Sequence, residues 1–91
     1  MTNIFEDFNG DYDASKNVTL NIMTRYEKAK VVGMRMEQIA RGANILVQPK
    51  TKNIRDIAFQ ELEERKLPFI IVRKLPNGEK EYWKIKDLIV V

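Results

Sequence analysis

The chain has 91 residues and a mass of 10.7 kDa, which limits it to one domain with a single hydrophobic core. Hydrophobic residues make up 44% and charged residues 32%, the balance of a globular chain rather than a disordered or fibrous one. No apolar run approaches the roughly 20 residues that a bilayer span requires. The sequence has no cysteine and no histidine, which excludes disulfides, thiolate or histidine zinc sites and the usual Cys/His and Ser/His/Asp nucleophiles.

The first 23 residues differ from the rest in charge and in pattern. They carry four acids against Lys16, a net charge of −3, whereas residues 24–91 carry a net charge of +6. Their apolar residues follow neither a helical nor a strand period. We expect residues 1–23 to form a flexible acidic tail, either an inert extension or a peptide that folds on a partner. The early acids also argue against a secretory signal and predict an intracellular chain.

A first helix is predicted from Thr24 to Gly42. Thr24 and Glu27 have the spacing of a capping box, and Gly42 supplies the residue type that ends many helices. A step of roughly 100° per residue defines a predicted core face. Its members are Tyr26, Ala29, Val32, Gly33, Met36, Ile39 and Ala40. Because Gly33 lowers helix propensity by about 1 kcal/mol, it predicts the close approach of another backbone or ring.

The far side of the same helix carries Val31, Met34 and Gln38. Two apolar side chains on an otherwise polar face indicate either burial against another chain or tolerated surface residues. The three residues are therefore candidates for a partner interface.

A loop over 43–52 leads to a second predicted helix at about 53–66. Its apolar face consists of Ile54, Ile57, Ala58, Phe59 and Leu62. Glu61 falls within this face, and a buried carboxylate needs a cation because unpaired burial is costly. Arg65, four residues on, and Arg35, on the first helix, are the two candidates. A structural role is favoured over a catalytic one because no second acid–base partner is evident.

A β-hairpin is predicted in the last part of the chain. Residues Phe69–Leu75 form a mostly buried strand, Pro76–Gly78 a turn, and Glu79–Lys86 an alternating second strand. Trp83 is assigned to the core, although a tryptophan could also stack on a nucleic-acid base. The final Leu88–Val91 predicts a short C-terminal strand or turn. The predicted fold class is therefore α+β, with two main helices, a hairpin and a flexible acidic N-terminal tail.

Several short motifs follow one another through residues 23–91. They are Thr24–Ala29, Gly33, Arg35, Gln38–Ala40, Gly42–Ala43, Leu46–Val47, Ile57–Ala58, Glu61–Leu62, Lys66–Pro68, Ile70–Ile71, Arg73, Leu75–Gly78, Trp83 and Asp87–Val90. In this order and spacing the sequence resembles the family of the small ω-like subunit of multisubunit DNA-dependent RNA polymerases. That subunit is called K in archaea and is the sixth, shared subunit in eukaryotes. The sequence departs from the family pattern at Met34, Met36 and Asn53–Ile54.

The resemblance implies a K/ω-like domain over 24–91 and a non-catalytic subunit of DNA-directed RNA polymerase. Such a subunit would bind the largest subunit and other polymerase subunits, promote assembly and stability, and hold no cofactor or metal. It would contact DNA only through the complex, with no membrane partner, in a nucleus, cytoplasm or virion according to its source.

The resemblance also implies residue roles. The structural set comprises Thr24 and Glu27 as a helix cap, Tyr26, Met36, Ile39 and Trp83 as core, and Arg35 with Glu61 as an ion pair. The implied partner-interface residues are Val31, Met34, Gln38 and Gly42.

A different class of function stays open from the composition. The basic body, with an isoelectric point of about 9.3, and Trp83 are compatible with an independent small nucleic-acid-binding protein. Such a protein would bind DNA or RNA with an affinity that falls steeply with salt.

Overall fold

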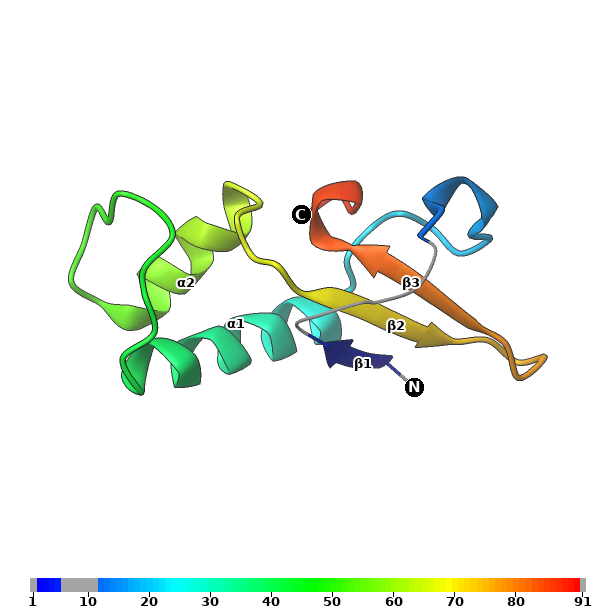
Figure 1. Ribbon diagram of the computed structural model, residues 1–91, viewed down its shortest axis with the longest axis horizontal. Helices are drawn as coiled ribbons and strands as arrows, with labels where there is room; N and C mark the ends of the chain where they lie inside the picture. The colour runs from blue at the N-terminus through cyan, green and yellow to red at the C-terminus, as the bar shows by residue number, and fades with distance from the viewer. Residues whose placement is uncertain (1, 6–11, 91) are drawn as a thin grey trace.

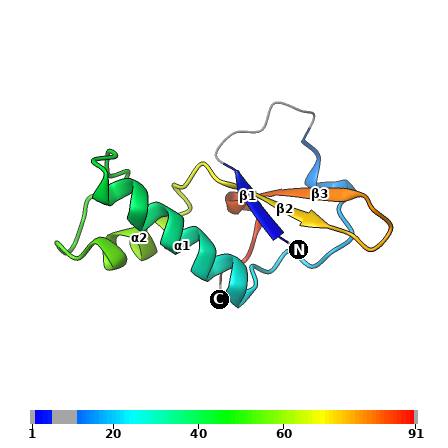
Figure 2. The same cartoon turned by 90° about the horizontal axis from the view of Figure 1, so that it is seen from below.

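In the computed structural model, which describes residues 2–5 and 12–90, two helices and a small antiparallel sheet form an elongated body of 43 × 25 × 20 Å. The elements are β1 (Thr2–Phe5), the short 3-10 helix η1 (Ala14–Lys16), α1 (Arg25–Ala40), α2 (Ile54–Glu63), β2 (Ile70–Lys74), β3 (Lys80–Lys84) and the 3-10 helix η2 (Ile85–Asp87). The helices lie side by side at the end opposite the hairpin turn (Figures 1 and 2). The α+β prediction of two helices, a hairpin and a short terminal turn is confirmed.

Both helices begin at side-chain caps. Thr24 Oγ1 accepts a hydrogen bond from the Glu27 N–H at 3.0 Å, and Glu27 Oε1 accepts one from the Thr24 N–H at 3.0 Å, which completes the predicted capping box. The Asn53 side chain caps α2. Beyond α1, Gly42 has a φ of 97°, the left-handed conformation that glycine tolerates. Helix α2 ends at Glu63, a few residues before the predicted end.

The buried face of α1 is rotated from the predicted one. Val31 and Val32 are buried, together with the charged Glu27 and Arg35. Tyr26, predicted in the core, is 60% exposed, so that prediction is wrong. The error has a physical cause: ion pairs allow two charged side chains to lie on the inner face, and a pattern based on apolar residues alone excludes them. Partly buried residues packed against the core include Met34, Met36 and Ile39.

The sheet has the order β1-β2-β3, with both pairings antiparallel. Strands β2 and β3 form the predicted hairpin, and Gly78 in its turn has a φ of 87°. Strand β1 pairs with the other edge of β2, where Thr2 lies opposite Arg73 and Phe5 opposite Ile70. The sequence did not predict this strand because the first residues have no alternating pattern. Residues 1, 6–11 and 91, which include acids of the predicted tail, lie outside the described residues.

Residues 12–23, assigned by sequence to a flexible tail, lie against the sheet and η2. The Tyr12 hydroxyl donates to Asp87 at 2.6 Å and accepts from the Lys84 N–H at 3.1 Å. Farther along, Ile22 and Ile89 form a parallel bridge. These contacts, which the sequence did not predict, place this part of the chain against the folded body, and its flexibility stays a prediction. They are made by individual side chains and isolated backbone groups, which leave no periodic signal in the sequence.

One hydrophobic core joins the helices to the sheet. Its buried members are Met23, Val31, Val32, Ala58, Leu62, Leu67, Phe69, Ile71, Trp83, Ile85 and Leu88. Trp83 is 5% exposed, as the alternating strand predicted. Within the described residues, no helix has the length and apolar character needed to cross a membrane.

Candidate functional site

A buried ion pair ties α1 to α2. Arg35 Nε lies 2.6 Å from Glu61 Oε1, and Arg35 Nη2 lies 2.9 Å from Glu61 Oε2. Glu61 is fully buried and Arg35 is 5% exposed. Two guanidinium N–H groups thus bind the two carboxylate oxygens in the bidentate geometry typical of arginine–carboxylate pairs. This contact confirms the expected Arg35–Glu61 pair.

The same pair also fixes the loop between the helices. Arg35 donates to the Asn44 carbonyl at 2.6 Å and to the Gln38 side chain at 3.1 Å, while the Leu46 N–H donates to Glu61 at 2.8 Å. Burial alone would raise the pKa of Glu61, but the hydrogen bonds from Arg35 and Leu46 outweigh it and hold that pKa below its ordinary value. The Glu61 carboxylate is therefore a fixed anion committed to structure.

A groove of about 620 Å³ lies beside this ion pair. We call it the loop groove. Its lining residues are Arg35, Gln38, Arg41, Gly42, Ala43, Asn44, Leu46, Pro68 and Phe69. Leu46 and the neighbouring Ile45 are 43% and 41% exposed. Exposed apolar side chains on a loop that is hydrogen-bonded to a buried ion pair, next to an open groove, have the character of a binding surface.

The four predicted interface residues fall in different places. Gln38 and Gly42 line the loop groove. Val31 is fully buried in the core of the chain itself, so its assignment to an exposed face is wrong. Met34 is partly buried against the core and lines a small adjacent depression with Gln38. The structure therefore brings together only part of the predicted set.

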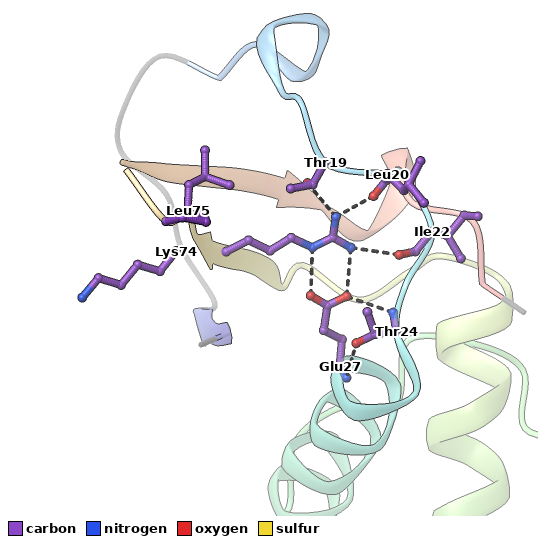
Figure 3. Close-up of a pocket in the computed structure, with 9 residues that line it drawn as sticks. Thr19, Leu20, Ile22, Thr24, Glu27, Lys74 and Leu75 are labelled. Carbon is purple, nitrogen blue, oxygen red and sulfur yellow. Dashed lines mark hydrogen bonds and ion pairs between the residues drawn. The ribbon is translucent and has the colours of Figure 1, made fainter. Parts of the chain in front are cut away.

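A second ion pair joins α1 to the sheet. Arg73 Nε and Nη2 each lie 2.9 Å from one carboxylate oxygen of Glu27, the residue that also caps α1. Arg73 donates further bonds to the carbonyls of Leu20 and Ile22. These residues line a pocket of about 520 Å³. Figure 3 shows Thr19, Leu20 and Ile22, from the segment before α1, on the side of the pocket opposite Lys74 and Leu75. The pair fixes the entry of the chain into α1.

Thr19 connects this second pair to β3. Its hydroxyl accepts from Arg73 at 2.9 Å and from the Trp83 indole at 3.1 Å, and it donates to Glu81. Glu81 also accepts from the Val18 N–H. Burial would raise the pKa of Glu81, but bonds from Thr19 and Val18 lower it below its ordinary value. We call Glu27, Arg73, Thr19, Glu81 and Trp83 the sheet network.

Sequence reasoning missed Arg73 and Glu81. A usable signal did exist, because Arg73 follows three apolar residues within β2 and Glu81 precedes the core residue Trp83 by two positions. These two residues lie opposite each other in the β2–β3 register. The chemistry of both centres is structural, since their carboxylates are committed to hydrogen bonds. Among the described residues, no group of three or more Asp or Glu side chains could hold a metal ion.

Known proteins match the chain over most of its length. The family model described as RNA polymerase Rpb6 matches residues 17–69, from the segment before α1 to the start of the sheet. A Caenorhabditis briggsae protein named probable DNA-directed RNA polymerases I, II, and III subunit RPABC2 is 43% identical over 75 residues, which cover 81% of this chain and 54% of that protein.

Two further relatives agree with this match. Saccharomyces cerevisiae DNA-directed RNA polymerases I, II, and III subunit RPABC2 is 40% identical over 77 residues, covering 82% of this chain and 49% of that protein. Arabidopsis thaliana DNA-directed RNA polymerases II and V subunit 6B is 40% identical over 73 residues, covering 79% and 51%. The chain spans about half the length of these relatives. The match over α1, the loop and α2 shows that the chain belongs to the RNA polymerase Rpb6 family.

Proposed function

We propose that this chain is a non-catalytic subunit of a DNA-directed RNA polymerase that binds the largest subunit and promotes assembly and stability of the enzyme. The observation that carries the proposal is the Rpb6 family match over residues 17–69. The relatives are named as polymerase subunits, and this chain corresponds to about half of their length. Its compartment would be the one that houses the polymerase, whether a nucleus, a cytoplasm or a virion.

The geometry supports a binding role through the loop groove. The matched region contains Arg35, Glu61 and the loop that they hold in place. A preorganised loop lowers the entropy lost on association, so exposed Ile45 and Leu46 can contribute binding energy without first being ordered. We therefore place the contact with the largest subunit at the loop groove, with Gln38 and Gly42 retained as interface residues.

The alternative of an independent nucleic-acid-binding protein loses one of its two supports. Trp83 is 5% exposed, and its indole N–H donates to Thr19 inside the sheet network. A tryptophan held in this way offers no face on which a base could stack. The basic charge alone remains, and it is also the ordinary charge of a solvated surface.

The first experiment is recovery of the chain from its source through an affinity tag, followed by native mass spectrometry. We expect the chain in a complex with very large polymerase subunits. Recovery mainly as a free monomer would contradict the proposal. The salt dependence of RNA and DNA binding by the isolated chain, measured in parallel, tests the alternative function.

A second experiment locates the contact. Leu46→Glu introduces a charge into the loop groove at a residue that is already 43% exposed, so we expect capture of the largest subunit to fall while the fold is kept. Ile54→Glu, at a 36% exposed position outside the groove lining, is the matched control. Equal loss of capture by both variants would remove the groove from the interface. Met34→Glu is less suitable because Met34 packs partly against the core.

A further inference from the structure

We propose that a second pocket, bordered by three cationic side chains, binds a short acidic peptide segment that carries an apolar anchor. The pocket has a volume of about 280 Å³ and is lined by residues of the segment between α2 and β2 and by residues at the end of β3 and in η2. Its lining consists of Arg65, Leu67–Ile70 and Lys84–Lys86. We call it the cationic pocket. It shares Pro68 and Phe69 with the loop groove but none of that groove's polar residues.

Arg65 has an unusual backbone for its residue type. Its φ is 56°, in the left-handed region, at the position after the α2 C-cap where glycine is the usual residue. The turn is closed by Arg65 N–H donating to the Leu62 carbonyl and Lys66 N–H donating to the Glu61 carbonyl, each at 3.0 Å. An L residue carries a steric cost here that glycine avoids, so the helix end itself gives no reason for an arginine.

The Arg65 side chain provides a reason. Its Nη1 donates to the Lys86 carbonyl at 3.2 Å, which bridges the end of α2 to η2 and holds the guanidinium beside the pocket. The remaining N–H groups of the guanidinium form a planar fork that suits a carboxylate. Strained backbone conformations cluster at ligand-binding sites. The strained backbone of Arg65, with its charged side chain beside a pocket, therefore indicates a ligand site.

Among the described residues that line the pocket, the charged ones are all cationic. Lys84 and Lys86 join Arg65 there. Two acidic neighbours in sequence do not line the pocket: Glu64 accepts from the Gln60 side chain at 2.8 Å, and Asp87 accepts from Tyr12. The pocket therefore has a local positive potential that favours an anionic partner.

The apolar part of the lining distinguishes a peptide from a nucleic acid. Pro68 and the aliphatic stems of the lysines can cover an apolar side chain placed between the charges. Phe69, the aromatic residue among the lining residues, is only 1% exposed and gives no stacking surface for a base. A peptide with carboxylates on both sides of an apolar residue fits both properties of the pocket.

The test is fluorescence anisotropy of the full chain with a labelled hexapeptide in which a Leu–Phe pair is flanked on each side by two glutamates. We expect saturable binding that weakens with salt and is lost when glutamine replaces each glutamate. Equal binding of the glutamine peptide would overturn the proposal. A single-stranded oligonucleotide or inorganic phosphate that displaces the peptide at lower concentration would also overturn it, since the pocket would then be a phosphate site.

Arg65→Gly separates binding from folding. Glycine suits the left-handed backbone, so this variant should unfold at a temperature no lower than the parent chain, while peptide affinity falls about three- to five-fold, the usual effect of one exposed ion pair. Lys80→Gln, an exposed site at the other end of β3, makes the same change in net charge and should leave affinity within about two-fold. Lys86→Gln is a second test that leaves the α2 end untouched, and it should also weaken binding.

Equal losses in Arg65→Gly and Lys80→Gln would show that only overall charge matters, and the assignment to the cationic pocket would be wrong. Because these measurements use the chain alone, their failure leaves the proposed polymerase role unaffected.

Discussion

The two halves of the molecule each contain a bidentate arginine–glutamate pair, but the two pairs hold different segments in place: one holds the loop between the helices, and the other holds the irregular segment before α1. In the helical half, Arg35 and Glu61 both come from helices, and they hold the loop between those helices through Asn44 and Leu46. In the sheet half, Arg73 reaches back to Glu27 and to the carbonyls of an irregular segment far away in sequence. An arginine side chain can thus satisfy backbone carbonyls of an irregular segment that has no backbone ladder of its own.

The largest effect should come from breaking the pair in the helical half. Arg35→Leu leaves the fully buried Glu61 without its cation, and we expect the free energy of unfolding to fall by about 3–5 kcal/mol in urea denaturation. The double variant Arg35→Leu/Glu61→Leu should be more stable than the single one because it removes the stranded charge. If the double variant is no more stable than Arg35→Leu, the pair does not behave as a coupled buried unit.

The next effect tests the sheet network. Thr19→Val keeps the side-chain shape but removes the hydroxyl shared by Arg73, Trp83 and Glu81, which should lower the free energy of unfolding by about 1–3 kcal/mol. Amide hydrogen exchange should rise at residues 18–22 and stay unchanged in α1 and α2. Thr51→Val, which removes a hydroxyl that accepts from the Asn53 N–H in the helix-connecting loop, is the control. Equal exchange changes in both halves would mean that the network does not anchor the segment locally.

Acid should lower the free energy of unfolding through one carboxylate in each half, Glu61 and Glu81. The pKa values of Glu61 and Glu81 lie below their ordinary value of 4.5, so the unfolded chain binds more protons than the folded one in acid. Their contribution is complete above about pH 4.5 and is lost as the pH falls through the lowered pKa values. The free energy of unfolding, measured from pH 7 to pH 3, should be level at first and then decline.

Glu81→Gln provides the comparison for this pH dependence. It should flatten the acid decline because a group with a lowered pKa has been removed. An unchanged slope in Glu81→Gln would show that Glu81 does not take part in acid unfolding.

The halves also differ in what the sequence could predict. Helix starts and the hairpin turn follow from local spacing, because each signal lies within one turn of the chain. The Arg35–Glu61 pair joins residues 26 positions apart, and spacing alone left Arg65 as an alternative partner of Glu61. The orientation of α1 could not be predicted in this way. Because Glu27 and Arg35 are buried, Val31 lies on the inner face of the helix and Tyr26 on the exposed face, the reverse of the prediction. Part of the site, Gln38 and Gly42 in the loop groove, was named in advance.

The sheet network lay beyond sequence reasoning for a different reason. Thr19 belongs to a segment with no period, and its partners on β2 and β3 are 54 to 64 residues away. Contacts of this kind depend on the tertiary arrangement of single side chains, whereas periodicity reports only which face of a regular element is apolar. The acidic composition that predicted a free tail says nothing about such contacts.

The smallest effect compares one glycine in each half. Gly33 lies on the exposed side of α1, and a Cβ built there meets no atom of the described residues within 4 Å, so these residues do not make the close approach expected from the sequence. Gly33→Ala should therefore raise the free energy of unfolding by about 0.5–1 kcal/mol through helix propensity, as a small increase in thermal midpoint. Gly78→Ala also meets no atom, yet its φ of 87° should make that substitution destabilising. Changes of opposite sign in the free energy of unfolding would show that backbone conformation, rather than available space, decides both cases. A lower free energy of unfolding in Gly33→Ala would mean that α1 is packed more tightly there than its exposed surface indicates.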